Sequence, residues 1–134
     1  MADIDHFKQV NDAYGHEIGD RLLREVARAI AQECRDVDLP ARYGGEEFAI
    51  VVPDERAENA AILARRCRQR IEEIRLRAND AAVRTTVSFG VADASDLESP
   101  AALIRRADEA LYEAKAAGRN TVLCSAAEAA GTRS

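Results

Sequence analysis

Two adjacent carboxylates interrupt what otherwise reads as a β-hairpin in the segment ARYGGEEFAIVV, residues 41–52. Gly44 and Gly45 can form the turn, because glycine adopts positive φ without steric cost. The turn needs neither Glu46 nor Glu47, and two like charges side by side repel each other unless a positive charge lies close. The pair is therefore either a solvated hairpin tip or part of a cation site.

Three more short segments place polar groups at the ends of expected strands and helices. They are DIDHFK at residues 3–8, NDAYGHEIGD at 11–20 and KAAGR at 115–119. Mg²⁺ takes oxygen ligands from one or two carboxylates and completes its shell with phosphates and water, while Lys and Arg neutralise the remaining phosphate charge. The pattern is compatible with a Mg²⁺–nucleotide site and, from the residues alone, equally compatible with scattered solvated charges.

The composition narrows the class of protein. The chain has 134 residues, 47% of them hydrophobic and 32% charged, which is typical of one globular domain. A net charge of −5 and only 4% aromatic residues argue against a nucleic-acid partner. The sequence shows neither an apolar run of membrane-spanning length nor a signal-peptide pattern, so we expect a cytoplasmic chain without a membrane segment. Three widely spaced cysteines in apolar contexts predict buried thiols rather than a metal cluster.

Hydrophobic periodicity predicts how these segments are positioned. Helical and strand-like patterns alternate along the chain, which favours an α+β fold (an α/β sandwich) with helices packed on a sheet. The expected elements are a helix over 17–34, strands over 39–43 and 47–52, a helix capped by Asp54 and ending near residue 76, a strand over 85–92, a helix from Ser99 and Pro100 to Gly118, and a last strand within 120–124.

Four stretches in this order closely resemble the GGDEF family of diguanylate cyclases: DIDHFKQVNDAYGHEIGD, RYGGEEFAIVVP, VSFGVA and ADEALYEAKAAGRN. Residues 44–48 form the GGEEF variant of the family signature, and the resemblance runs from Asp3 to about Val122. It implies a central sheet flanked by helices, similar to nucleotidyl cyclases and the polymerase palm, with GGEEF on a β-hairpin. It also implies a GGDEF catalytic domain over 1–124 and a loose C-terminal tail over 125–134.

The resemblance implies that two GTP molecules are joined into cyclic di-GMP with release of two pyrophosphates. Each domain of a homodimer would hold one GTP. Asp3, Glu46 and the backbone carbonyl of Ile4 match the family's ligands for Mg²⁺ (or Mn²⁺). Glu47 would support the metals or the attacking 3′-hydroxyl, and which carboxylate acts as the base stays open. Gly44 and its neighbour Gly45 would let the hairpin backbone approach GTP.

The resemblance also assigns the substrate contacts. Asn11 and Asp20 match the guanine readers, since amide and carboxylate groups complement the guanine edge; each could instead only cap a helix. Lys115 and Arg119 match the triphosphate anchors, and Lys8 a further phosphate contact. Basic residues near a helix end are otherwise ordinary partners of the helix dipole.

A second site precedes the signature. Arg35-Asp36-Val37-Asp38 forms an RxxD motif with five residues between Asp38 and Gly44. At this distance the family has an inhibitory site for its product, cyclic di-GMP, and Arg66 matches an additional arginine of that site. Arg66 lies in an arginine-rich stretch, so it is equally compatible with a solvated helix face.

One departure from the family concerns the N-terminal side. The family normally has a helix, a DxLTGLxNR stretch and most of the first strand before the position of Asp3, and an upstream regulatory domain is expected in the natural protein. A shortened central strand leaves neighbouring strand edges unpaired and apolar surface exposed. We therefore expect reduced stability, weak catalysis or association through the exposed edge. The alternative function is an inactive domain that binds GTP or cyclic di-GMP.

Overall fold

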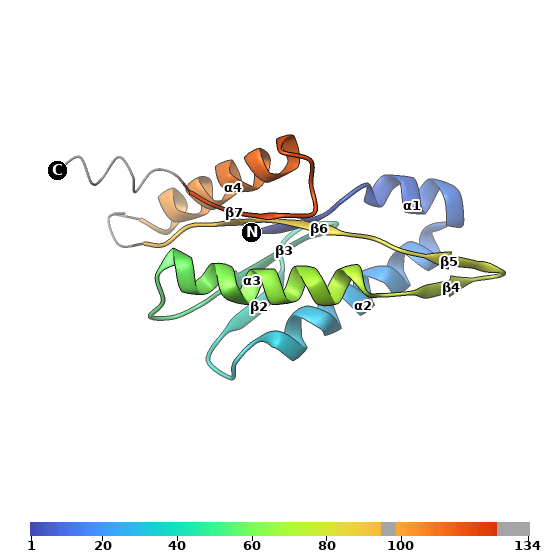
Figure 1. Ribbon diagram of the computed structural model, residues 1–134, viewed down its shortest axis with the longest axis horizontal. Coiled ribbons are helices and arrows are strands. Elements are labelled where there is room, and N and C mark those ends of the chain that lie inside the picture. Colours follow the sequence, from blue (N-terminus) through green and yellow to red (C-terminus); the bar gives the residue numbers. More distant parts are fainter. Residues whose placement is uncertain (95–98, 126–134) are drawn as a thin grey trace.

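The computed structural model describes residues 1–94 and 99–125, so the expected C-terminal tail lies almost entirely outside the described residues. These residues form an α+β fold in which helices cover both faces of a five-stranded mixed sheet of order β2-β3-β1-β6-β7 (Figure 1). The helices are α1 (Phe7–Tyr14), α2 (His16–Glu33), α3 (Ala57–Glu72) and α4 (Pro100–Ala116). The sheet strands are β1 (Ala2–Ile4), β2 (Leu39–Arg42), β3 (Glu47–Val51), β6 (Val87–Val91) and β7 (Val122–Cys124).

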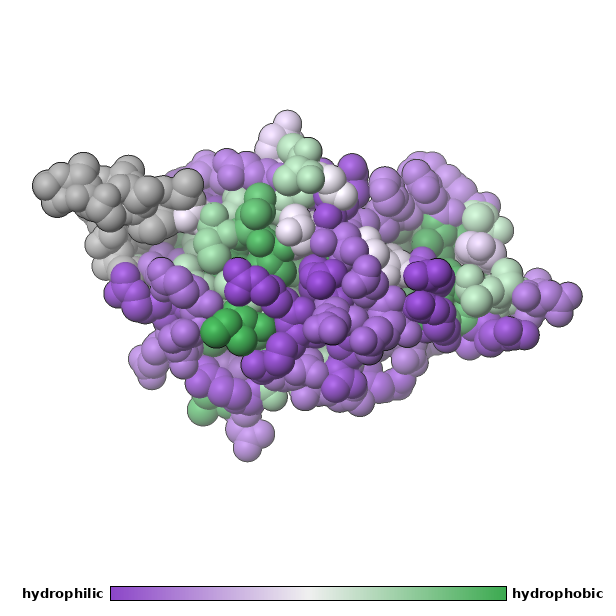
Figure 2. Space-filling model, in the orientation of Figure 1, coloured by the Kyte–Doolittle hydropathy of each residue, from purple (hydrophilic) through white to green (hydrophobic). Residues whose placement is uncertain are grey.

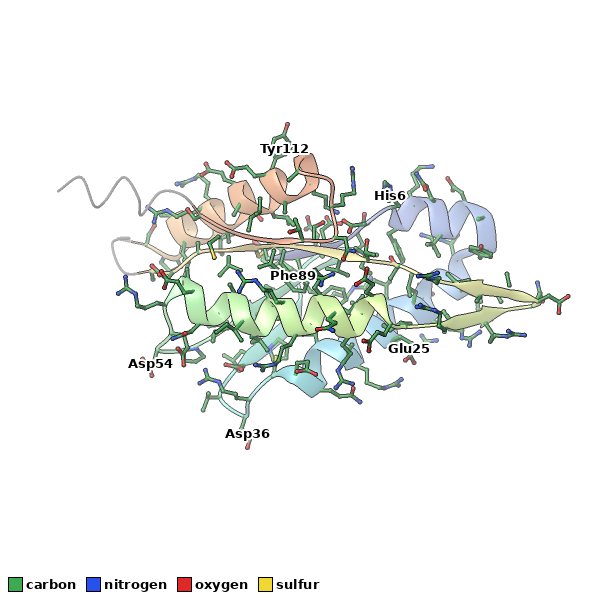
Figure 3. The ribbon with its side chains drawn as sticks, viewed as in Figure 1. His6, Glu25, Asp36, Asp54, Phe89 and Tyr112 are labelled. Carbon is green, nitrogen blue, oxygen red and sulfur yellow. The ribbon has the colours of Figure 1, made fainter. Side chains whose placement is uncertain are left out.

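The short strand β1 lies at the centre of the sheet. It pairs antiparallel with β3 on one side and with β6 on the other, so that Ala2 is opposite both Phe48 and Phe89. Ala2 and Ile4 are buried, as is every residue of β6, because α4 packs on one face of the sheet and α3 and α2 lie on the other (Figure 1). Phe89 lies at the sheet between α3 and α4 (Figure 3). The end of β1 is therefore held rigidly in the middle of the domain.

Several sequence-based expectations for the elements are confirmed. The GGEEF hairpin forms between β2 and β3 with bounds one residue inside the expected strands. Ser99 caps α4 by accepting a hydrogen bond from the backbone N–H of Ala102 at 3.2 Å. Gly118 follows the end of α4 with a φ of +117°, a conformation that favours glycine. The last strand forms as β7.

Other expectations are wrong in detail. Asp54 does not cap the second helix, since it has a φ of +60° in a turn and α3 begins at Ala57. The carboxylate of Asp93, from a distant loop, accepts the Ala57 N–H instead at 2.8 Å. That helix ends at Glu72, and a small hairpin that was not expected follows it. Its strands are β4 (Leu76–Ala78) and β5 (Ala81–Val83).

Helix α1 and the cysteines also differ from expectation. The residues FKQVNDAY form helix α1, which was not expected. His6, the residue before it, has a left-handed φ of 58° and makes no side-chain capping hydrogen bond, so the start of the helix has no local sequence signal. Within the described residues the three cysteines form no disulfide, and only Cys67 is buried; Cys34 is half-buried and Cys124 is exposed. Within the described ranges, no helix has the length and apolarity that crossing a membrane requires.

An apolar groove of about 760 Å³ continues the line of β1 beyond Met1. Its walls come from β3 and β6 on either side and from α3 and α4 above and below, including Ile50, Leu63, Val91 and Ile104. Figure 2 shows hydrophobic residues gathered between α3 and α4 on a surface that is otherwise mostly hydrophilic. The groove leaves apolar side chains accessible beside the short central strand β1.

Candidate active site

The end of β1 meets the tip of the GGEEF hairpin. Asp3 is opposite Glu47 in the antiparallel register, and the backbone N–H of Ile4 donates to the carbonyl of Glu46 at 3.2 Å. The proposed metal ligands Asp3, Ile4 and Glu46 therefore lie at adjacent strand ends, although Glu46 is more than forty residues from the other two in sequence. This arrangement favours the cation-site alternative for the glutamate pair over an isolated hairpin tip.

The hairpin turn is held open by its own residues. The guanidinium of Arg42 donates to the carbonyls of Gly44 and Gly45 at 3.1 and 2.6 Å. A Cβ at Gly44 would lie 2.9 Å from the Glu47 carboxylate, so glycine is needed there for the carboxylate to take this position. Nothing lies within 4 Å of a Cβ at Gly45. Sequence reasoning missed Arg42, because its position two residues before Gly44 gave no separate signal.

The carboxylates at this junction lie close enough to repel one another. The pKa of Glu47 is raised, first by burial and then by the nearby charges of Asp3, Asp108 and Glu46. Within residues 1–94 and 99–125, no group of three or more His, Cys, Asp or Glu side chains is arranged to hold a metal. Two carboxylates and a backbone carbonyl are nonetheless a donor set that Mg²⁺ accepts, since it fills its remaining positions with phosphate and water. The residues present fit such an ion.

Lys115, from the last turn of α4, reaches the same junction. Its Nζ donates to Asp3 Oδ1 at 3.1 Å, to the Asp3 carbonyl at 3.4 Å and to Asp5 Oδ1 at 3.0 Å. The structure thus brings together two predicted site residues that are 112 positions apart. Asp5 was not among the predicted site residues. The DxD spacing was its signal, because residues two apart in extended backbone face the same side, and Asp5 follows directly after β1.

The other predicted phosphate contacts lie further from this centre. Arg119 is exposed in the turn after α4, with a left-handed φ of 65°. Lys8 is exposed on the first turn of α1 and pairs with Asp12 at 2.9 Å. The pair with Asp12 does not support a phosphate contact, so the role of Lys8 stays a prediction.

The two predicted guanine readers lie at the junction of α1 and α2. A Cβ at Gly19 would come within 1.8 Å of Asn11 Oδ1, so only glycine allows this close contact next to Asp20. Asn11 Oδ1 is buried and has no hydrogen-bond partner in the described part of the chain. Neither residue is a helix cap, since α2 begins at His16 and places Asp20 inside the helix. The capping alternative is therefore wrong.

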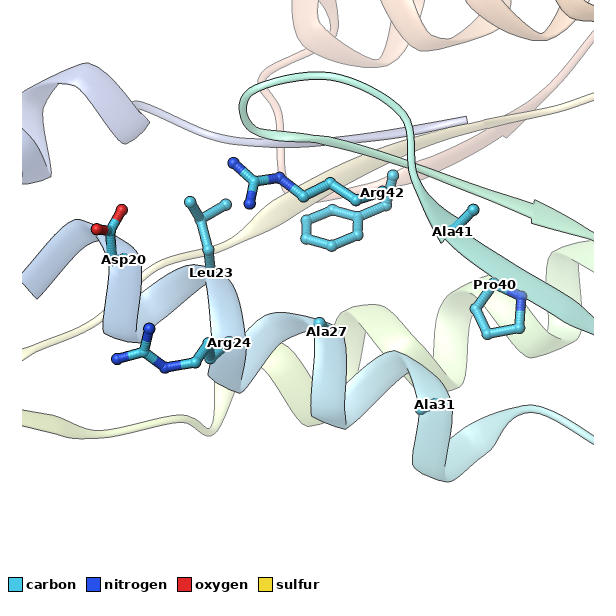
Figure 4. A pocket seen from close by; sticks show the side chains of 9 residues that line it. Asp20, Leu23, Arg24, Ala27, Ala31, Pro40, Ala41 and Arg42 are labelled. Atoms are coloured by element: carbon cyan, nitrogen blue, oxygen red, sulfur yellow. The ribbon is translucent and has the colours of Figure 1, made fainter.

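Asp20 also lines a groove of about 540 Å³ between α2 and the GGEEF hairpin. Figure 4 shows Asp20, Leu23 and Arg24 on α2, with the Arg42 side chain extending from β2 toward Leu23. Phe48 also lines the groove. The groove combines an apolar lining with a few charged groups, which is typical of a small-ligand site.

The predicted inhibitory-site residues form a charged cluster on a different surface. Arg35 donates from its guanidinium to Asp38 Oδ1 at 2.9 Å, and its backbone N–H donates to Asp38 Oδ2 at 2.7 Å. The Asp38 side chain is fully buried, whereas that of Arg35 is 48% exposed. Arg66, from α3, pairs with Glu33 at the end of α2 at 3.0 Å. Both arginines are thus presented to solvent, with Asp38 holding Arg35 in place.

Replacing Asp38 with asparagine should destabilise the domain in a pH-dependent way. The pKa of Asp38 is lowered, first by the hydrogen bond from Arg35. Its contribution is therefore present above the ordinary aspartate pKa and is lost as pH falls through the lowered value. We expect Asp38→Asn to cost about 1–3 kcal/mol of unfolding free energy at pH 7 and less near pH 3, measured by urea denaturation. Exposed Asp36→Asn is the control; an equal loss at both pH values would contradict this account.

The family model for the diguanylate cyclase GGDEF domain matches residues 1–121 of this chain. The chain belongs to the GGDEF domain family. Response regulator PleD of Caulobacter vibrioides is 44% identical over 130 residues, which cover 95% of this chain and 29% of PleD. Diguanylate cyclase A of Treponema denticola is 44% identical over 126 residues, covering 93% of this chain and 34% of that protein. The chain thus spans about a third of the length of these relatives.

Solved structures agree with this fold. Diguanylate cyclase SiaD of Pseudomonas aeruginosa, crystallised with its activator SiaC, matches with a TM-score of 0.88 and 40% identity over 92% of this chain and 47% of that one. The GGDEF domain of DgcB from Caulobacter crescentus, in complex with c-di-GMP, matches with a TM-score of 0.87 and 39% identity over 92% of this chain and 74% of that one. The α+β fold with GGEEF on a hairpin is therefore confirmed.

Proposed function

We propose that this GGDEF domain condenses two GTP molecules into cyclic di-GMP, releasing two pyrophosphates, with Mg²⁺ or Mn²⁺ as the metal. The observation that supports this most is the convergence of Asp3, the GGEEF carboxylates and Lys115 at the end of β1. Carboxylates beside a lysine suit a metal-bound triphosphate better than either group alone, since the two charges divide between the metal and the phosphates.

The chemistry is an in-line displacement at phosphorus. The 3′-oxygen of one GTP attacks the α-phosphate of the other, and the bond from the α-phosphate to pyrophosphate breaks. Asp3, Glu46 and the Ile4 carbonyl would hold the metal, which polarises the phosphoryl oxygens and favours ionisation of the 3′-hydroxyl. Lys115 and Arg119 would bind the triphosphate, with Lys8 as a further contact. Positioning and charge stabilisation are the main contributions of the protein.

The groove beside Asp20 would receive the guanine. The Asp20 carboxylate can accept from the guanine N1–H and N2–H₂ groups, and the Asn11 amide can bond to O6 or N7. The Nδ2–H₂ group of Asn11 would donate to these acceptors, whereas its buried, unpartnered Oδ1 is itself an acceptor and could bond only to an N–H of a ligand. Adenine lacks the N1–H and N2–H₂ donors that Asp20 would bind, so it would leave this carboxylate unpaired and the site should discriminate strongly in favour of GTP.

One domain supplies only half of the reaction, since each GTP must attack the other. Catalysis therefore requires two copies of the domain to meet face to face as a homodimer. The relatives are about three times longer than this domain. We propose that an upstream regulatory domain in the natural protein brings the two copies together.

Product inhibition is the second part of the proposal. The half-exposed Arg35 and Arg66 could bind the phosphates and guanine edges of cyclic di-GMP, as arginine does bidentately. The complex of the DgcB domain with c-di-GMP shows that a related domain binds this ligand. Here both carboxylate oxygens of the buried Asp38 accept from Arg35, so within this site we assign Asp38 to holding the arginine.

The test is chromatography of the products formed from GTP and Mg²⁺ by the purified chain, after any bound cyclic di-GMP has been removed. Cyclic di-GMP from the parent chain and not from Glu46→Gln would support the cyclase and the role of Glu46. If the parent yields none but binds cyclic di-GMP, and Arg35→Ala abolishes that binding, the chain is a binding module. If the chain forms no cyclic di-GMP and does not bind it, both functions are refuted.

A further inference from the structure

We propose that Asp5 is a positioning residue that sets both proposed phosphate anchors, Lys115 and Arg119, from beneath the site. This inference rests on the proposed function, because it concerns how the GTP triphosphate is bound. It comes from the hydrogen bonds of a single buried carboxylate, which sequence reasoning had not assigned to the site.

Asp5 is 3% exposed, yet its carboxylate is fully satisfied. Oδ1 accepts from the Ser88 hydroxyl at 2.8 Å and from Lys115 Nζ at 3.0 Å. Oδ2 accepts from the Thr86 hydroxyl at 2.7 Å and from the backbone N–H of Asn120 at 3.0 Å. Four donors therefore meet on one side chain. They come from β6, from the residue before β6, from α4 and from the turn after α4.

The bond to Asp5 gives Lys115 a partner that a metal does not compete for. Lys115 also contacts Asp3, but Asp3 is a proposed metal ligand and is partly exposed. Asp5 is buried and already surrounded by donors, so it stays on Lys115 when Asp3 turns to a cation. The lysine is then held at the edge of the metal site, where the triphosphate would arrive.

Asp5 also fixes the turn that carries Arg119. Gly118, Arg119 and Asn120 all have positive φ, of 117°, 65° and 49°, which is unusual for the two non-glycine residues. The Asn120 N–H is tied to Asp5, and its side chain donates to Glu72 of α3 at 2.9 Å. Holding the residue after Arg119 in this conformation fixes the direction in which the arginine leaves the backbone.

The experiment measures binding of α,β-methylene GTP, which cannot react at its α-phosphate, and of guanosine, which has no phosphates. In the presence of Mg²⁺, we expect Asp5→Asn to weaken binding of the analogue by about tenfold and to leave guanosine binding within twofold. In a Lys115→Met background, Asp5→Asn should have a smaller effect, because part of its action passes through the lysine. The carboxylate of Asp93, which accepts at the opposite end of α3, gives the control Asp93→Asn.

If Asp5 had a merely structural role, Asp5→Asn would lower the melting temperature and weaken the binding of both ligands equally. That result would overturn the inference. Two further measurements need no ligand: the NMR chemical shift of Lys115 Nζ and the amide hydrogen exchange rate of residues 118–121. Asp5→Asn should change the chemical shift and accelerate the exchange. Unchanged values would also overturn the inference. If the parent chain does not bind the analogue but these signals change, the proposed function fails while the positioning role of Asp5 stands.

Discussion

Replacing Asp3 with asparagine should lower the rate of cyclic di-GMP formation by about a thousandfold, corresponding to about 4 kcal/mol of lost transition-state stabilisation. Asp3 lies at the end of β1, opposite Glu47 and bonded to Lys115, so its charge serves both the metal and the lysine. Asparagine keeps the shape but offers a weaker, neutral ligand. The measurement is the initial rate of product formation from GTP at saturating Mg²⁺.

The fold should tolerate this change. Removing one carboxylate relieves the repulsion that contributes to the raised pKa of Glu47, so the melting temperature should stay the same or rise. Asp80→Asn is the matched control, because Asp80 is exposed in the turn between β4 and β5 and has no role in the proposed site. An Asp3→Asn variant with more than a tenth of the parent activity would show that Asp3 does not hold the metal.

Replacing Gly90 with alanine should destabilise the domain by about 3 kcal/mol or more, the upper range for overpacking a tight contact. A Cβ at Gly90 would lie 2.2 Å from the Ala107 carbonyl oxygen and 2.2 Å from the Leu111 nitrogen. Both atoms are backbone of α4, so no side chain can turn away and the helix itself must shift. Urea denaturation with a two-state fit measures the change in unfolding free energy.

The same substitution should reduce activity, because α4 carries Lys115 to the site. Gly45→Ala is the control for stability, since nothing lies within 4 Å of a Cβ there and the free energy of unfolding should change by less than about 0.5 kcal/mol. A loss below about 1 kcal/mol for Gly90→Ala would mean that α4 packs less rigidly on β6 than the close contact implies.

Much of the local structure could be predicted from the sequence by itself. The GGEEF hairpin and α4 have strong local signals: two glycines in a turn, a Ser-Pro start and a glycine stop, all of which act within a few residues. Helix α1 and the β4–β5 hairpin lack such signals, and Asp54 gave a misleading one. The N-terminal turn of α3 is capped from Asp93, 36 residues away, and local reading cannot find that partner.

The residue types of the site were also predictable, because four motifs in a fixed order carry the family resemblance. Their meeting at one place was decided by the tertiary structure. Only the central position of β1, paired on both sides, brings Asp3 beside Glu47, and only the packing of α4 on β6 brings Lys115 to it. Asp5 shows the difference most clearly. Its DxD spacing with Asp3 is a weak sequence signal, whereas its four donors come from segments 81 to 115 residues away. Hydrogen-bond partners at that separation are set by sheet register and helix packing, and composition and periodicity do not encode them directly.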